Sequence, residues 1–167
     1  MSEQTGVARP ERATIEDLTR IVEAWREFWG ERELGALHHP LLVHEFGETA
    51  LVVRDADGCV NAYLFGLLTP ARVGYIHLVS VRDGHRRAGL GRRLYEHFES
   101  VAAERGALAL KAVTQPVNTG SIAFHRSLGF TAADVPDYSG PGQTRTVFYK
   151  QLHGRPRPAG TAAGLSN

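Results

Sequence analysis

Three features that mark whole classes of protein are scarce in the sequence: cysteine, net charge and long apolar runs. Cys59 is the only cysteine, so the chain cannot form an internal disulfide or a multi-cysteine metal cage. A formal net charge of +1 argues against the broad basic face of a general nucleic-acid binder. The longest apolar run, residues 62–68, is far shorter than the roughly 20 residues that span a bilayer.

No signal-peptide stretch of apolar residues occurs in residues 1–10, and a single thiol fits a reducing compartment. We therefore expect a cytoplasmic protein with no membrane partner. The length of 167 residues, with 43% hydrophobic and 22% charged residues, suits one folded domain. Eight of the last fourteen residues are Gly, Pro or Ala, a composition that buries too little surface to offset its ordering entropy. The expected organisation is a flexible N-terminus at 1–5, a domain at 6–153 and a flexible tail at 154–167.

Apolar periodicity and turn residues predict the elements of this domain. Thr14, followed by an acid at Asp17, predicts a helix start, and the helical spacing continues to about Gly30. A turn signal at residues 55–58 predicts a hairpin. Apolar and β-branched runs predict strands at 49–54, 59–68, 73–81, 107–113, from 129 and at 144–152, with helices from 90 and at 118–128. The order β-α-β-β-β-α-β-α-β-β predicts a mixed α/β domain with one central sheet.

The most informative segment is a glycine- and arginine-rich turn between a strand and a helix. Residues 82–93 hold five arginines against one aspartate, a local charge of +4. Gly89 and Gly91 let backbone N–H groups approach a ligand, and the helix start adds unpaired N–H groups and the positive end of its dipole. This pattern indicates a phosphate-rich ligand; the alternative is a solvated turn. The spacing matches neither the dinucleotide-binding nor the Walker pattern.

Two motifs carry a resemblance to a known family. The pattern Arg86-x-x-Gly89-x-Gly91 after a hydrophobic strand resembles the acetyl-CoA-binding motif of the GNAT superfamily of N-acetyltransferases. Residues 118–130, which begin with Asn118 and end with Gly129-Phe130, are similar to a second segment of that family. The element order over residues 7–152 also matches. The resemblance implies a GNAT fold, in which a mixed sheet of six to seven strands is flanked by about four helices, with a splayed strand pair that holds CoA.

The resemblance also implies acetyl-CoA as co-substrate, with no metal. Backbone groups of Val79 and Val81 would pair with the pantetheine arm as though it were an added strand. The N–H groups of residues 87–92 would hold the pyrophosphate with help from the arginines. Asn118 would hydrogen-bond the far side of the pantetheine, cap its helix, or do both. The implied cofactor-binding set is Val79, Ser80, Val81, Arg86, Arg87, Ala88, Gly89, Leu90, Gly91, Arg92 and Asn118.

Two histidines are the candidate catalytic residues. The family usually has a tyrosine at the position of His125, where it gives a proton to the departing CoA thiolate. Seven residues separate His125 from Asn118, so both share one helix face, and an imidazolium there could replace the tyrosine. The alternative is a histidine packed without a proton role.

The second candidate, His77, is expected to share a strand face with Tyr75, Val79 and Val81 by alternation. Some family members carry histidines on this strand that relay the acceptor's proton. The alternative is a structural strand histidine. Tyr75 and Tyr138 are weaker candidates, and the turn-rich residues 134–143 either overhang the acceptor site or form a hairpin end.

These expectations combine into an acyltransferase that moves an acetyl group from acetyl-CoA directly to a primary amine of a small molecule, a peptide or a protein. Two alternatives remain open: a catalytically weak CoA-binding regulatory domain, and a toxin-type acetyltransferase acting on aminoacyl-tRNA. The net charge of −3 outside residues 82–93 disfavours a nucleic-acid partner. Both a monomer and a homodimer are compatible with the sequence. No metal is expected, because His38, His39 and His44 lack an acid or cysteine at ligand spacing.

Overall fold

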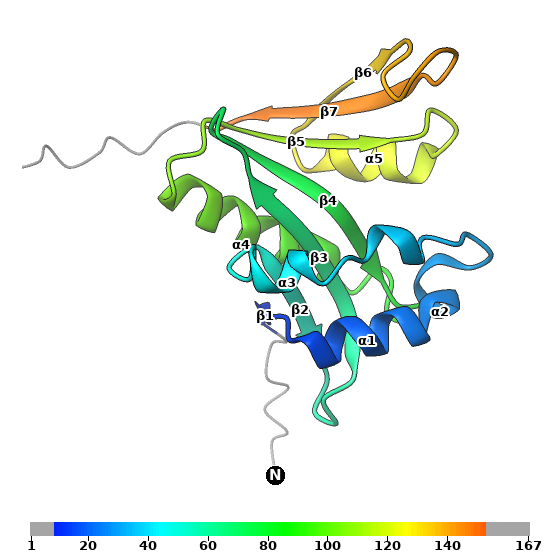
Figure 1. Ribbon diagram of the computed structural model, residues 1–167, viewed down its shortest axis with the longest axis vertical. Helices are drawn as coiled ribbons and strands as arrows, with labels where there is room; N and C mark the ends of the chain where they lie inside the picture. The colour runs from blue at the N-terminus through cyan, green and yellow to red at the C-terminus, as the bar shows by residue number, and fades with distance from the viewer. Residues whose placement is uncertain (1–8, 153–167) are drawn as a thin grey trace, which may run out of the picture.

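Seven strands form one mixed sheet, in the order β1-β2-β3-β4-β5-β7-β6, in the computed structural model, which describes residues 9–152 (Figure 1). All neighbouring strands are antiparallel except β4 and β5, which are parallel. The strands are β1 Glu11–Arg12, β2 Ala50–Arg54, β3 Val60–Leu68, β4 Val73–Val81, β5 Ala109–Thr114, β6 Thr131–Val135 and β7 Arg145–Gln151. The predicted mixed sheet and element order are confirmed. The proposed flexible segments, 1–5 and 154–167, lie outside the described residues.

Five α-helices and one 3₁₀ turn accompany these strands in the part of the chain that the structure describes. They are α1 Ile15–Glu23, α2 Trp25–Trp29, η1 Gly35–Leu37, α3 Leu41–His44, α4 Leu90–Glu104 and α5 Thr119–Ser127. The helix expected to continue to Gly30 is interrupted at Ala24, whose backbone (ψ 21°) leaves the helical region. The predicted start is confirmed, because Thr14 Oγ1 accepts the Asp17 N–H at 3.2 Å and Asp17 Oδ2 accepts the Thr14 N–H at 2.7 Å.

Two hydrophobic cores lie on opposite faces of the sheet. Helices α1 to α3 cover β2–β4 on one face, with a core that includes Phe28, Tyr63 and Leu78 (Figure 1). Helices α4 and α5 cover the other face, with a core that includes Phe98 and Phe148. No helix of residues 9–152 covers β5, β7 and β6 on the α1–α3 side. That half of the sheet is therefore open on one face.

The parallel strands β4 and β5 separate along their length. They pair from Val73–Ala109 to Ile76–Ala112, after which β4 continues to Val81 and β5 to Thr114 without pairing. The expected splayed strand pair is thus present. At the same point β4 carries a bulge against β3: Phe65 pairs with Leu78 and Gly66 with Ile76, which leaves His77 as the extra residue. A bulge bends a strand and redirects its side chains, here where the gap opens.

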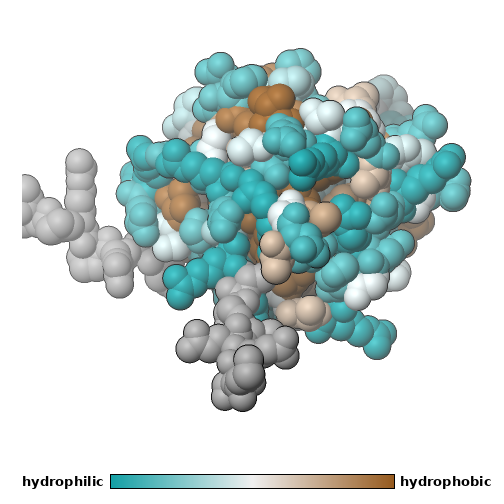
Figure 2. Space-filling view, turned by 90° about the horizontal axis from the view of Figure 1, so that it is seen from below, coloured by the Kyte–Doolittle hydropathy of each residue, from teal (hydrophilic) through white to brown (hydrophobic). Residues whose placement is uncertain are grey.

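The surface seen from below in Figure 2 is mainly hydrophilic, and its apolar residues form small separate groups. Apolar atoms contribute much of any folded protein's surface, so scattered groups of this kind require no special explanation. Within residues 9–152, no helix has both the length and the apolar character needed to cross a membrane.

Candidate active site

The turn from β4 to α4 exposes a row of backbone N–H groups. Arg87 and Gly89 have positive φ angles of 67° and 76°, and Gly89 is the N-cap of the 15-residue α4. The N–H groups of Arg87, Gly89 and residues 90–92 have no hydrogen-bond acceptor within residues 9–152. Unpaired N–H groups at the positive end of a long helix form an anion-binding site. The geometry therefore suits a pyrophosphate, and binding by these residues stays a prediction.

The arginines of this turn divide into structural and accessible ones. Arg82 pairs with Glu27 and lies over the ring of Phe28, which ties the turn to α2. Arg86 pairs with Asp83 at 3.0 Å. Arg87 lies in an exposed part of the turn, where its charge is accessible to a ligand.

Gly91 has a packing role that the motif alone does not show. A Cβ atom at this position would lie 3.2 Å from Phe124 Cζ of α5 and 3.8 Å from Val81 Cγ2. The absent side chain allows α4 to pack closely against α5. A larger residue at Gly91 would therefore disturb helix packing as well as any ligand.

The edge of β4 beyond Ile76 faces a gap rather than a strand. Val79 and Val81 pack toward the α4 side, whereas the Ser80 hydroxyl donates to the Phe28 carbonyl at 2.9 Å on the α2 side. Across the gap, Asn118 caps α5: its Oδ1 accepts the Ser121 N–H and its Nδ2 donates to Thr114 Oγ1, both at 3.1 Å. The structure thus shows the capping role, and the pantetheine role stays a prediction.

His125 lies in the core, and the packed alternative fits its geometry. It is 3% exposed, its ring stacks on Phe148 at 3.8 Å, and burial lowers its pKa. Its Nδ1 lies 2.8 Å from the Ser121 carbonyl, which can only accept, so Nδ1 carries the proton. Nε2 then accepts from the Tyr95 hydroxyl at 2.7 Å. Both nitrogens thus have partners, which favours the packed alternative, and a proton-donor role of His125 stays a prediction.

His77 faces the gap from a different side than alternation predicted. Because it is the bulge residue, the face of β4 changes there: Val79 and Val81 contact the α4-side core, whereas His77 Nε2 lies 3.1 Å from the Leu37 carbonyl of η1. The expected shared face with Val79 and Val81 is therefore wrong. The carbonyl accepts, so Nε2 carries a proton, and in the neutral imidazole the lone pair is on Nδ1. His77 thus retains the geometry of a base.

The loop from β6 to β7 reaches back over β5. The Tyr138 ring lies 5.2 Å from Lys111 Nζ, and Tyr75 of β4 pairs in register with Lys111. Residues 134–143 thus include the hairpin end between β6 and β7, and their place over an acceptor site stays a prediction. Sequence reasoning missed Lys111, although one lysine in an otherwise apolar strand was a visible signal.

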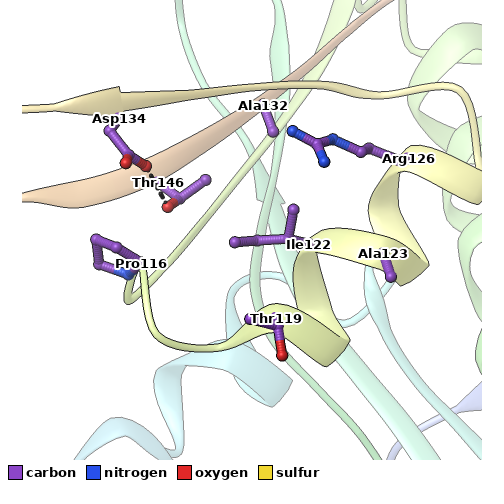
Figure 3. Close-up of a pocket in the computed structure, with 8 residues that line it drawn as sticks. All are labelled: Pro116, Thr119, Ile122, Ala123, Arg126, Ala132, Asp134 and Thr146. Carbon is purple, nitrogen blue, oxygen red and sulfur yellow. Dashed lines mark hydrogen bonds between the residues drawn. The ribbon is translucent and has the colours of Figure 1, made fainter.

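A separate pocket of about 400 Å³ lies on the outer side of α5, between this helix and β6–β7 (Figure 3). Ile122 and Ala132 form apolar walls, Arg126 lies at one end, and Asp134 accepts a hydrogen bond from Thr146 at 2.6 Å. None of the residues expected to bind the cofactor or to act in catalysis lines it. Within residues 9–152, no three His, Cys, Asp or Glu side chains are grouped to hold a metal ion.

Comparisons with known proteins agree with this architecture. The sequence model of the acetyltransferase (GNAT) family matches residues 15–130, more than half of the chain. Ard1 from Thermoplasma volcanium is 23% identical over 88% of this chain and 99% of that one, with a TM-score of 0.74.

Two other solved structures are similar. The ribosomal-protein-S18-alanine N-acetyltransferase from Escherichia coli is 18% identical over 90% of this chain and 99% of that one, with a TM-score of 0.68. The protein yncA from Salmonella typhimurium, solved with its cofactor acetyl-CoA, is 23% identical over 93% and 99%, with a TM-score of 0.67. Among curated proteins, no sequence matches this chain. At these identities the structural likeness shows the fold.

Proposed function

Because the chain belongs to the GNAT family of acetyltransferases, and is therefore an acyltransferase, we propose that it transfers the acetyl group of acetyl-CoA to a primary amine. The observation that carries the proposal is the unpaired edge of β4 beside the unpaired N–H groups at the start of α4. Together they offer one continuous track for a pyrophosphate with an extended amide-bearing arm.

We expect CoA to lie along this track with its pyrophosphate at the start of α4 and its thioester toward the middle of β4. The pyrophosphate lies against residues 87–92, with the charge of Arg87 near it. The pantetheine arm then follows β4 backward past Val81 and Val79, with its amides paired to the strand edge. On this path the thioester would lie near His77, where β4 and β5 part.

The chemistry is direct transfer. The neutral amine attacks the thioester carbonyl, the carbon–sulfur bond breaks and CoA leaves as a thiolate, while the amine nitrogen gives up its extra proton. His77 Nδ1 accepts that proton directly or through a water, and solvent protonates the thiolate. Orientation of the two substrates supplies much of the acceleration. Cys59, an exposed residue of the β2–β3 turn, has no part in it.

A two-part experiment tests the proposal. Release of free CoA from acetyl-CoA is followed with a panel of amines and peptides, and CoA affinity is measured by calorimetry. We expect amine-dependent release and CoA binding that weakens at least tenfold in Arg87→Glu, with little change for pantetheine, which lacks the pyrophosphate. Arg20→Ala, which removes a charge from exposed α1, serves as the control and should bind CoA normally. CoA binding without turnover of any amine would instead indicate a regulatory domain.

A further inference from the structure

The chain has only two lysines, and they lie on opposite faces of the sheet. Lys150 faces α4, where its Nζ lies 2.6 Å from Glu99 Oε2. Lys111 faces the other way, because its neighbours Leu110 and Ala112 belong to the α4-side core. Within residues 9–152, the ammonium group of Lys111 makes no ion pair and no hydrogen bond.

Tyrosines surround this unpaired ammonium group. Tyr75 of β4 and Tyr149 of β7 are its register partners on either side, and the Tyr138 ring lies 5.2 Å from Nζ. Burial raises the pKa of Tyr75, and the electrostatic effect of the Tyr138 phenol raises it further. The Tyr75 and Tyr138 hydroxyls have no hydrogen-bond partner among the described residues.

Lys111 is a partly buried residue whose ammonium group has no carboxylate partner within residues 9–152, so its charge is available to an anion. One ammonium group and two phenols offer several donors to a single anionic group. Tyr75 and Lys111 are register partners in β4 and β5, one position before the last pair of these strands. They lie on the same face of the sheet as His77. The unpaired donors therefore lie beside the point where the acetyl group would arrive.

We propose that Lys111, Tyr75 and Tyr138 bind a carboxylate of the acceptor, and that the acceptor is a small amine that also carries a carboxylate. This inference rests on the proposed function and narrows its acceptor. Charge-assisted hydrogen bonds to the carboxylate would orient the amine toward the thioester. Tyr75 and His77 are two residues apart on β4, which is roughly 7 Å along a strand. A carboxylate several bonds from the amine fits that spacing.

The test compares two matched series of acceptors. One series is the ω-amino acids from glycine to 6-aminohexanoate, and the other is the alkylamines of the same chain lengths without the carboxylate. The readout is the ratio of kcat/KM between the two members of each pair, measured by CoA release. We expect a ratio of about ten or more for the best chain length, the usual size of one charged hydrogen bond. Acidic dipeptides form a third arm.

Variants assign the effect to the site. In Lys111→Met the ratio should fall to about one, and in Lys111→Arg, which keeps the charge, much of it should remain. Tyr138→Phe lowers the ratio without removing a residue from the sheet. The control is Lys150→Met, on the opposite face, which should keep the wild-type ratio.

The outcomes separate the two proposals. Equal rates with both series, or a preference that survives in Lys111→Met, would overturn this inference and leave the acetyltransferase proposal standing. Acetylation of acidic dipeptides but not of ω-amino acids would overturn the small-molecule assignment. Failure of every amine to release CoA would overturn the proposed function and this inference with it.

Discussion

Two histidines near the gap lie in opposite chemical environments. His125 is neutral, stacked and hydrogen-bonded at both nitrogens, to Ser121 and Tyr95. His77 is accessible and uses only Nε2, as a donor to Leu37. A proton acceptor needs an open lone pair within reach of the substrate, so we expect base chemistry from His77 and a packing role for His125.

Loss of His77 should slow catalysis in a pH-dependent way. His77→Ala removes the acceptor for the ammonium proton, so its turnover should fall by about 10²-fold or more near neutral pH. The defect should shrink toward pH 9, because more of the acceptor is then free amine. Rates across this pH range, with saturating acetyl-CoA, measure it. A defect that stays constant with pH would contradict the assignment.

Substitution of His125 should affect stability more than turnover. His125→Phe leaves the buried Tyr95 hydroxyl without its partner, which costs about 1–3 kcal/mol in the free energy of unfolding. Turnover should stay within tenfold of the parent. The double variant Tyr95→Phe/His125→Phe should recover much of the lost stability in denaturant unfolding. A 10²-fold loss of turnover in a well-folded His125→Phe would restore the proton-donor role.

At the scale of elements, α1 is anchored by its first turn. The Asp17 carboxylate caps the helix with Thr14 and also accepts hydrogen bonds from Arg54 Nε (3.0 Å) and Nη2 (2.5 Å). Burial alone would raise the pKa of Asp17, but the hydrogen bonds from Arg54 and Thr14 hold it below the usual value. The Asp17 side chain thereby joins α1 to β2, and Arg54 extends the link to β1 through Glu11.

Removal of this carboxylate should destabilise the fold. Asp17→Ala should lower the free energy of unfolding by about 2–3 kcal/mol at neutral pH, because it removes both the cap and the Arg54 pair. A carboxyl group whose pKa is lower in the folded than in the unfolded chain stabilises the fold at pH values above its unfolded pKa. The difference in the free energy of unfolding between Asp17→Ala and the parent should therefore shrink as pH falls below about 4. Glu16→Ala, which changes an exposed acid of the same turn, is the control and should cost about 0.5 kcal/mol or less. Equal losses in both variants would contradict the anchoring role.

At the scale of the molecule, the sheet separates two cores, and each contains a buried neutral histidine. In the α1–α3 core, the Tyr63 hydroxyl donates to His38 Nε2 at 2.7 Å, and His38 Nδ1 donates to the Leu34 carbonyl at 2.8 Å. Burial lowers the pKa of His38, as it does for His125. Both covered faces of the sheet are thus sensitive to protonation, whereas the open face presents Lys111.

The whole domain should lose stability between pH 7 and pH 5. The unfolded chain binds protons at both histidines as pH falls through about 6.5, whereas the folded chain binds them only at lower pH, so stability falls with pH in this range. Urea unfolding at several pH values measures the slope. Tyr95→Phe/His125→Phe, which removes one of the two histidines, should have a shallower slope than the parent. A slope unchanged by that variant would show that His125 does not contribute.

Much of the fold could be read from local patterns, because hydrophobic periodicity, caps and turns act over a few residues. The strand at 73–81 has the predicted bounds, and the helix that begins at Leu90 follows the glycine–arginine turn as expected. The unpaired N–H groups of that turn also follow from local sequence, since a helix start always leaves them. These are the parts of the candidate site that one segment forms alone.

The rest depended on contacts between distant segments. Alternation predicted the face of His77, but a bulge against β3 changed it. Helical spacing suggested that His125 shares a face with Asn118, but only the contacts with Tyr95 of α4 and Phe148 of β7 show that the His125 ring is enclosed. Lys111 became a candidate binding residue only because the β6–β7 loop brings the Tyr138 ring close to its ammonium group. Side-chain environment is set by strands and helices that meet only in three dimensions, so tertiary structure alone decided which of these residues face the gap.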